Sequence, residues 1–309
     1  VSMIKELSGQ INKYFIGKEE IVKNVLICLL SGGHVLLEDV PGVGKTTLAK
    51  TLSKSIDSSF GRIQFTPDTL PGDILGVNVY NAKKQEFEYK EGIISNQLIL
   101  ADEINRTSPK TQSALLEAMA EGQTTIDGVV HKLPDPFMVI ATQNPIEFMG
   151  TYPLPEAQLD RFMMKLSIGY PGEESEIQMA QNFADGLSIE DIKPVCTTKD
   201  IIKAKKDVEK IHISNELITY ARSIIDYTRN EEKISLGASP RALLNLIRAS
   251  QALAYINQRD FVKPDDIKEV AVNVLHHRVM LSSEAKISRE NVDELLLWLI
   301  GKADVPTEK

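Results

Sequence analysis

The sequence has only two cysteines and lacks any long apolar run. Cys28 and Cys196 show no metal-type spacing, which argues against a disulfide framework and favours a reducing, cytoplasmic setting. The longest apolar runs, residues 25–30 and 295–300, are about six residues long, far short of the roughly 20 that cross a bilayer. The first residues also lack the pattern of a signal peptide. We therefore expect a cytoplasmic protein without a membrane span.

Positive charge is also in deficit. The 35 Lys and Arg residues are outnumbered by 43 Asp and Glu residues, which gives a formal net charge of −8. Binding to a nucleic-acid backbone depends on clustered Lys and Arg, so this balance disfavours nucleic acid as a partner. With 309 residues, 42% of them hydrophobic, the chain is long enough for two globular domains, each with its own core.

Residues 36–47, with the sequence LLEDVPGVGKTT, have the pattern of a phosphate-binding loop between a strand and a helix. Gly42 and Gly44 allow the backbone to approach a polyphosphate, so that the loop amides and the positive end of the helix face the same anion. Lys45 is expected to reach the β- and γ-phosphates of ATP, and the Thr46 hydroxyl to bind Mg²⁺. The residues expected to contact the nucleotide here are Pro41, Gly42, Val43, Gly44, Lys45, Thr46 and Thr47.

The first position of the usual pattern, G-x-x-x-x-G-K-[ST], holds Asp39 instead of glycine. A carboxylate turned toward the phosphates would weaken nucleotide binding, and we expect this side chain to turn outward. The flanking sequence still supports a phosphate-binding loop despite Asp39, because a buried strand precedes the loop and an amphipathic helix follows it.

A second apolar stretch, residues 98–101, ends in two adjacent carboxylates, Asp102 and Glu103. Ligands collect at the carboxyl ends of parallel strands, so these acids and the phosphate loop are expected to share one sheet edge. There, Asp102 would hold Mg²⁺ through its water shell, and Glu103 would polarise the water that attacks the γ-phosphate. Taken alone, the stretch is equally consistent with a strand followed by a solvated acidic turn.

Two other positions are candidates for nucleotide contact. Asn144 follows the buried strand 137–143 and is placed either to hydrogen-bond the γ-phosphate or attacking water, or to form a turn before the next proline. Ile16 and Gly17 separate two helical patterns, and this turn either lines a base pocket or only breaks the helix.

Two arginines follow with roles that the sequence leaves open. Arg161 lies in a short helix, 154–162, where no apolar stripe explains it. It is either an arginine finger given to a neighbouring subunit's nucleotide or the partner of Asp160 or Glu156 in a salt bridge. Arg241 lies on the first turn of a helix that Ser239 caps, where solvent and a bound phosphate are equally available.

Helical spacing of apolar residues dominates the rest of the chain. A proline-broken insertion near residues 66–76 and a hairpin near 123–133, with Asp127-Gly128 at its turn, interrupt the first half. After residue 170 the strand signals thin out. Helices are predicted at 4–15, 18–30, 109–121, 173–184, 199–210, 215–228, 241–257, 265–281 and 289–300.

Four stretches together resemble an ATPase of the AAA+ superfamily, specifically its MoxR branch. They are VPGVGKTT (40–47), LILADEINR (98–106), IATQNP (140–145) and LPEAQLDRF (154–162). The similarity covers nearly the whole chain. It implies an α/β fold with an AAA+ P-loop core, a parallel αβα sandwich, over residues 1–170, followed by a smaller all-helical lid over residues 171–309.

The resemblance also implies roles for individual residues and segments. On the family pattern, Lys45 and Thr46 belong to Walker A, Asp102 and Glu103 to Walker B, Asn144 to sensor 1, Arg161 to the arginine finger and Arg241 to sensor 2. The insertion near 66–76 resembles the helix-2 insertion of this branch, and the hairpin near 123–133 its pre-sensor-1 insertion. Family members hydrolyse ATP with Mg²⁺ at the subunit interfaces of a ring, usually a hexamer. The family further implies a chaperone-like action on partner proteins that often carry a von Willebrand factor A domain.

Two other functions compete with a remodelling ATPase. The substitution at Asp39 motivates a nucleotide-gated assembly scaffold that binds ATP but barely hydrolyses it. A DNA-remodelling motor that uses the Asp127 hairpin is weaker, because the hairpin offers only His131 and Lys132 as basic groups.

Overall fold

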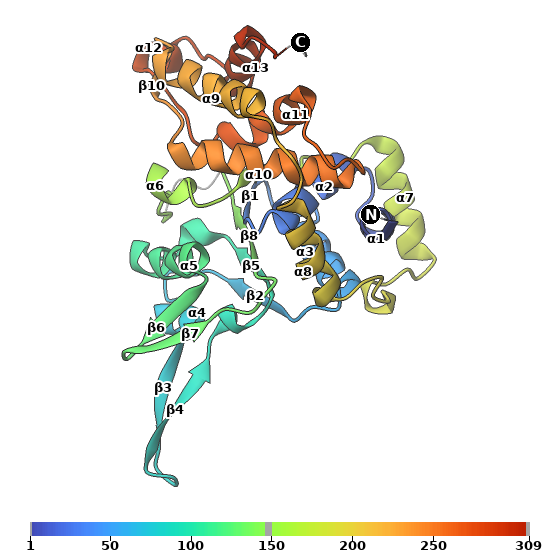
Figure 1. Ribbon diagram of the computed structural model, residues 1–309. Helices are drawn as coiled ribbons and strands as arrows, with labels where there is room; N and C mark the ends of the chain where they lie inside the picture. Colours follow the sequence, from blue (N-terminus) through green and yellow to red (C-terminus); the bar gives the residue numbers. More distant parts are fainter. Residues whose placement is uncertain (1, 146–149, 307–309) are drawn as a thin grey trace.

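The centre of the molecule is a five-stranded sheet in the order β2-β5-β8-β1-β9, in which every neighbouring pair is parallel (Figure 1). The computed structural model describes residues 2–145 and 150–306. The strands are β1 (Val35–Glu38), β2 (Phe60–Gln64), β5 (Leu98–Asp102), β8 (Met138–Gln143) and β9 (Met164–Leu166). β1, β5 and β8 are buried almost throughout, which explains their unbroken apolar runs.

Helices cover both faces of the sheet. Alternate residues of β1 point to opposite sides, so Val35 and Leu37 join one apolar cluster with residues of α2 and α3, whereas Leu36 joins another with residues of α5. The predicted parallel αβα core is therefore confirmed. The helices of this part are α1 (Ser2–Tyr14), α2 (Glu19–Leu30), α3 (Lys45–Ser55), α4 (Pro71–Leu75), α5 (Pro109–Glu121) and α6 (Glu156–Leu159).

The chain after residue 170 is helical, as predicted for a lid, apart from one short two-stranded sheet. Helix α10 packs against α2 of the core as well as against α9 and α11, and one apolar cluster runs through both parts. The predicted boundary at residue 170 falls in the connection between β9 and α7. The helices are α7 (Glu173–Ala184), α8 (Thr198–Val208), α9 (Asn215–Asn230), α10 (Pro240–Ile256), α11 (Pro264–Leu275), α12 (Ser283–Ile287) and α13 (Val292–Lys302).

Two hairpins extend from the core on the side away from the lid (Figure 1). The first, β3 (Gly76–Asn81) and β4 (Glu86–Glu91), follows α4. The second, β6 (Gln123–Ile126) and β7 (Val129–Lys132), turns at Asp127 and Gly128, whose φ values of 49° and 82° fit the predicted Asp-Gly turn. Tyr89 stacks on His131 with ring centroids 4.1 Å apart, which joins the two hairpins.

Several elements were missing from the sequence prediction. The β3–β4 hairpin is solvated and turns without an Asn-Gly or Asp-Gly pair, so it lacks both a buried face and a turn signal. Strand β9 has three residues, too few for a periodic pattern. The helix predicted over 265–281 ends at Leu275, and β11 (Met280–Leu281) then pairs with β10 (Ile234–Leu236). None of the helices in the described ranges is long and apolar enough to cross a membrane.

Candidate functional site

The phosphate loop joins the carboxyl end of β1 to helix α3. Gly42 and Gly44 have φ values of 88° and 93°, a backbone region that side chains disfavour. α3 begins at Lys45, and its N-cap, Gly44, has no side chain to accept the N–H groups of the first turn. These N–H groups and the positive end of an 11-residue helix form the anion-binding arrangement that the pattern indicates.

Asp39 is buried at the start of this loop, with 5% of its surface exposed. Its carboxylate accepts hydrogen bonds from the Ser167 hydroxyl at 3.0 Å, the Gly169 amide at 2.9 Å and the Ile168 amide. Its carbonyl oxygen accepts one from Lys45 Nζ at 2.7 Å. The carboxylate that replaces glycine is thus committed to residues 167–169, in the connection between β9 and α7.

The two acids after β5 lie in a dense polar network. The Thr142 hydroxyl donates to Asp102 Oδ1 at 2.7 Å and accepts the Glu103 amide at 2.9 Å, which ties β5 to the adjacent strand β8. Arg62 Nη2 donates to Asp102 Oδ2 at 2.8 Å. Both oxygens of the Asp102 carboxylate therefore have a partner, and its orientation is fixed.

The Glu103 side chain has hydrogen-bond partners of its own, and the backbone φ of this residue, 57°, lies in the left-handed region. Its Oε2 accepts hydrogen bonds from Gln64 Nε2 at 2.7 Å and from Arg106 Nη1 at 2.9 Å. Arg106 also forms an ion pair with Glu103 through this contact. Asn144 is buried one residue beyond the end of β8.

Sequence reasoning missed Arg62, Gln64 and Thr142. A usable signal was present, because Gln64 ends β2 and Thr142 lies one residue before the end of β8. Parallel strands bring their carboxyl ends to one edge, so polar residues at those ends are candidates even without a named motif.

Lys45 lies among these acids. Partial burial lowers the pKa of Lys45, while the negative charges of Asp39, Asp102 and Glu103 act in the opposite direction. The ammonium group, both acids and the start of α3 are thus brought to one sheet edge, as expected from the sequence.

The oxygen donors at this edge fit Mg²⁺ bound together with a triphosphate. In the described part of the chain the hydroxyl of Thr46 has no hydrogen-bond partner, and a hydroxyl and a carboxylate are ligands that Mg²⁺ accepts. No group of three or more His, Cys, Asp or Glu side chains suited to a metal was found among the described residues. A magnesium ion here would therefore depend on phosphate and water oxygens as well as on Thr46 and Asp102.

The other residues of the phosphate loop differ in exposure, and the segment that leads into the Ile16-Gly17 turn packs against the loop. Val43 is buried, Thr47 is half-buried and Pro41 is exposed. Phe15 packs on the loop, since a Cβ added to Gly44 would lie 3.1 Å from its ring. Ile16 lines a cavity of about 620 Å³ between α1 and the α7 region, but the lining includes no residue of the phosphate loop, so the base-pocket interpretation of this turn stays a prediction.

Gly17, with φ of 73°, closes against α7. A Cβ at this position would come 2.1 Å from the Ser175 hydroxyl, so only glycine fits without a shift. The turn between α1 and α2 thus packs directly against α7.

Arg161 and Arg241 are not part of this cluster. Arg161 precedes β9, and together with Gly33 and His34, which precede β1, it lines a cavity at the amino ends of the strands. Arg241 lines the same cavity from α10. Both arginines therefore lie at the sheet edge opposite to the phosphate loop.

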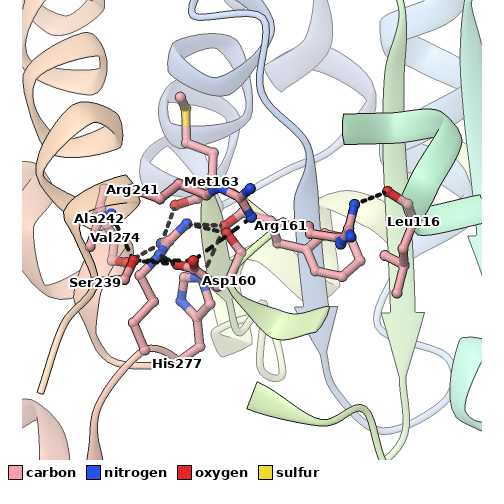
Figure 2. A network of polar contacts seen from close by, with 11 residues as sticks. Leu116, Asp160, Arg161, Met163, Ser239, Arg241, Ala242, Val274 and His277 are labelled. Carbon is pink, nitrogen blue, oxygen red and sulfur yellow. Dashed lines mark hydrogen bonds and ion pairs between the residues drawn. The ribbon is translucent and has the colours of Figure 1, made fainter. Parts of the chain in front are cut away.

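The partners of these arginines differ from those that the sequence suggested (Figure 2). Arg161 Nη1 donates to the Leu116 carbonyl at 3.0 Å and forms no ion pair with Asp160. Asp160 instead binds Arg278 Nε at 2.7 Å and accepts the Ser239 hydroxyl at 3.1 Å, with Arg241 Nη1 at 3.8 Å. No local pattern predicts the contact of Arg278 with Asp160, which lies 118 residues away in the chain.

Comparison with known proteins agrees with this geometry. The profile of the ATPase family associated with various cellular activities (AAA) matches residues 34–164, and that of the AAA lid domain matches residues 226–296. A crystal structure of an inferred ATPase from Cytophaga hutchinsonii superposes with a TM-score of 0.92 at 40% identity, covering 99% of this chain and 96% of the other.

Several bacterial proteins are similar to this chain in sequence, and two of those described here carry the MoxR name. YeaC of Bacillus subtilis is 48% identical over 97% of this chain and 93% of its own length. Chaperone MoxR1 of Mycobacterium tuberculosis is 40% identical over 96% of this chain and 81% of its own length, and Protein MoxR of Paracoccus denitrificans is 28% identical over 93% and 91%. Together with the parallel core, the phosphate loop and the helical lid, these matches show that the chain belongs to the MoxR family of AAA+ ATPases.

Proposed function

We propose that this protein hydrolyses ATP with Mg²⁺ and uses the cycle to remodel or activate partner proteins. The observation that carries the proposal is the convergence of Lys45, Asp102, Glu103 and Asn144 at one sheet edge, beside the uncapped start of α3. A polyphosphate, a divalent cation and a reactive water all have complementary groups at this edge.

Each group has a proposed task. The first-turn amides of α3 and Lys45 bind the triphosphate, and Thr46 and Asp102 hold the cation. Bound Mg²⁺ supplies positive charge to the phosphate oxygens. Glu103, oriented by Gln64 and Arg106, polarises the attacking water, and Asn144 hydrogen-bonds the γ-phosphate or that water.

The positions of Arg161 and Arg241 support action on a neighbouring subunit. They lie at the edge opposite to the phosphate loop of their own chain, whereas an arginine finger must reach a γ-phosphate. We propose that the chain assembles into a ring, with a hexamer as the expected size, so that each subunit's arginines meet the next subunit's nucleotide.

The proposed partner proteins follow from the family resemblance. One similar protein carries the name Chaperone MoxR1, and the resemblance to the MoxR branch suggests clients with a von Willebrand factor A domain. Buried Cys28 and Cys196 are free thiols, which suits a cytoplasmic setting.

The test is Glu103→Gln, with Glu117→Gln, an exposed carboxylate on α5, as the matched control. Loss of a general base should reduce turnover by about 10²- to 10⁴-fold while ATP binding is kept. Phosphate release and binding of a fluorescent ATP analogue are measured for both variants and the wild type. Unchanged turnover in Glu103→Gln would remove Glu103 from the mechanism.

Protein concentration separates the ATPase from the scaffold alternative. Because Arg161 is proposed to act between subunits, specific activity should rise steeply as the protein assembles. An assembly scaffold would stay near background at every concentration. A client can be sought by pull-down with Glu103→Gln in ATP, since slowed turnover prolongs the ATP-bound state.

A further inference from the structure

The cavity at the amino ends of the strands contains a third arginine, Arg248. The cavity has a volume of about 390 Å³ and lies between the turn before β1 and helix α10. Arg161 lines it from the segment before β9, whereas Arg241 and Arg248 line it from α10. Three guanidinium-bearing residues from two directions thus share one space.

The spacing on α10 explains why both of its arginines reach the cavity. Positions 241, 245 and 248 follow the i, i+4, i+7 spacing of one helix face, and Asn245 also lines the cavity. The Ser31 hydroxyl donates to the Arg248 carbonyl at 3.2 Å, which fixes this turn of α10 against the end of α2. The backbone under Arg248 is therefore anchored, while its side chain remains exposed.

The positive charge of this cavity is poorly compensated. Its lining contains no Asp or Glu. In the described ranges, neither Arg161 nor Arg248 forms an ion pair, and Asp160, at 3.8 Å from Arg241, is already bound to Arg278 at 2.7 Å. Guanidinium groups form bidentate hydrogen bonds with phosphate oxygens, so a phosphate-bearing anion is the ligand that fits this lining.

The triphosphate of the same chain cannot be that ligand. His34 lines the cavity and Asp39 starts the phosphate loop, and the five residue steps of extended chain from one to the other span roughly 16 Å. A phosphate in this cavity must therefore come from another molecule. A second copy of the chain carries one at its own phosphate loop.

We propose that Arg248 is a third phosphate-binding arginine, which meets the ATP of a neighbouring copy beside Arg161 and Arg241. The proposal rests on the proposed ATPase function and extends it, because neither a family motif nor the sequence pattern singles out Arg248. The phosphate site is complete only when two copies meet.

The first test compares Arg248→Ala and Arg248→Lys with the wild type. In Arg248→Ala, loss of one charge-assisted hydrogen bond should raise the KM for ATP by about tenfold or more. In Arg248→Lys the increase in KM should be smaller, because lysine keeps the positive charge but cannot form the bidentate contact of a guanidinium group. Arg222→Ala is the matched control and should leave KM unchanged, since the ion pair of this exposed arginine on α9, within residues 2–145 and 150–306, is with Asp226. Equal KM values for Arg248→Ala and the wild type would overturn the proposal.

The second test asks in which subunit Arg248 acts. Arg248→Ala is mixed with Lys45→Ala, which has intact arginines but a defective phosphate loop. Mixed assemblies contain interfaces that join the intact loop of one variant to the intact Arg248 of the other, so activity should exceed the average of the two variants measured alone. No gain on mixing would overturn action between subunits.

Binding of a fluorescent ATP analogue separates this proposal from the ATPase function. If the wild type binds the analogue without hydrolysing ATP, the proposed function fails, and the role of Arg248 is decided by binding alone. Weaker binding by Arg248→Ala at protein concentrations where the wild type assembles would still support the phosphate contact, and equal binding would overturn it.

Discussion

At the scale of single residues, His34 shows how a buried polar group is fixed in one protonation state. Its Nδ1 accepts the Val139 amide at 3.0 Å, which requires this nitrogen to be unprotonated, and its Nε2 contacts the Met119 carbonyl at 3.3 Å as a donor. Burial lowers the pKa of His34 to about 4; the Met119 carbonyl opposes this shift, and the charge of Lys205 adds to it. The ring therefore stays neutral in the folded protein at ordinary pH.

This shift predicts a loss of stability in mild acid. An unfolded histidine takes up a proton near pH 6.5, whereas folded His34 does so only near its pKa of about 4. The free energy of unfolding should therefore be unaffected above about pH 6.5 and fall between pH 6.5 and 4, by up to about 3 kcal/mol from this residue. Urea unfolding at several pH values measures the fall.

His34→Asn is the comparison variant, because its side chain can still accept the Val139 amide but does not titrate in this range. The fall in stability on acidification should be smaller in this variant than in the wild type. The pKa of buried His277 is also lowered by desolvation, but this contribution is present in both proteins and cancels. Identical pH dependence in the two proteins would contradict the role of His34.

At the scale of elements, Asp39 couples the phosphate loop to the connection between β9 and α7. Its carboxylate holds the backbone amides of Ile168 and Gly169, and Lys18 Nζ donates to the Tyr170 carbonyl at 2.8 Å and to that of Ile168. Residues 167–170 are thus fixed from two sides, by the phosphate loop and by the turn before α2. A glycine at position 39, as in the common pattern, would leave these amides without their acceptor.

Asp39→Ala should therefore destabilise the protein. The substitution removes a charged acceptor and leaves two amide donors unpaired, at an expected cost of about 2–3 kcal/mol. Chemical denaturation measures the change, and hydrogen exchange at the Ile168 and Gly169 amides should become faster. Asp68→Ala, at an exposed position before α4, is the control that should change neither. Unaltered exchange at both amides in Asp39→Ala would refute this coupling.

At the scale of the whole molecule, the lid is joined to the core through a buried arginine. Arg278, with 6% of its surface exposed, follows α11 and donates to Asp160 Oδ1 at 2.7 Å, to the Asp160 carbonyl at 3.1 Å and to the Met163 carbonyl at 3.0 Å. Burial lowers the pKa of Arg278, and the hydrogen bond with Asp160 opposes this shift. The arginine thus ties the lid to the segment before β9.

Arg278→Met should cost about 3–5 kcal/mol of stability, because it leaves the Asp160 carboxylate and several carbonyls without their donor. Adding Asp160→Asn to this variant should recover part of the loss, since the stranded charge is then removed. Urea unfolding of the single and double variants measures both effects, with Arg222→Met on α9 as the control. A loss below about 1 kcal/mol in the single variant would mean that this joint is not important for stability.

Local sequence patterns were sufficient to predict the core of this protein and the residues at its phosphate edge. Apolar runs ending in polar residues identify β1, β5 and β8, and the carboxyl ends of parallel strands must meet, so Lys45, Asp102, Glu103 and Asn144 could be placed together without coordinates. Helical periodicity likewise identified most of the lid, because long amphipathic helices carry a strong repeating pattern.

The positions of the arginines and the residues that support the site depend on how distant segments pack together. The Asp160–Arg278 pair, the Asp39 contacts with residues 167–169 and the cavity shared by Arg161, Arg241 and Arg248 join segments far apart in the chain. The physical reason is that local patterns report on burial and backbone preference within a few residues. Partners of buried charges are chosen only when separate elements pack together, and no local pattern records that choice.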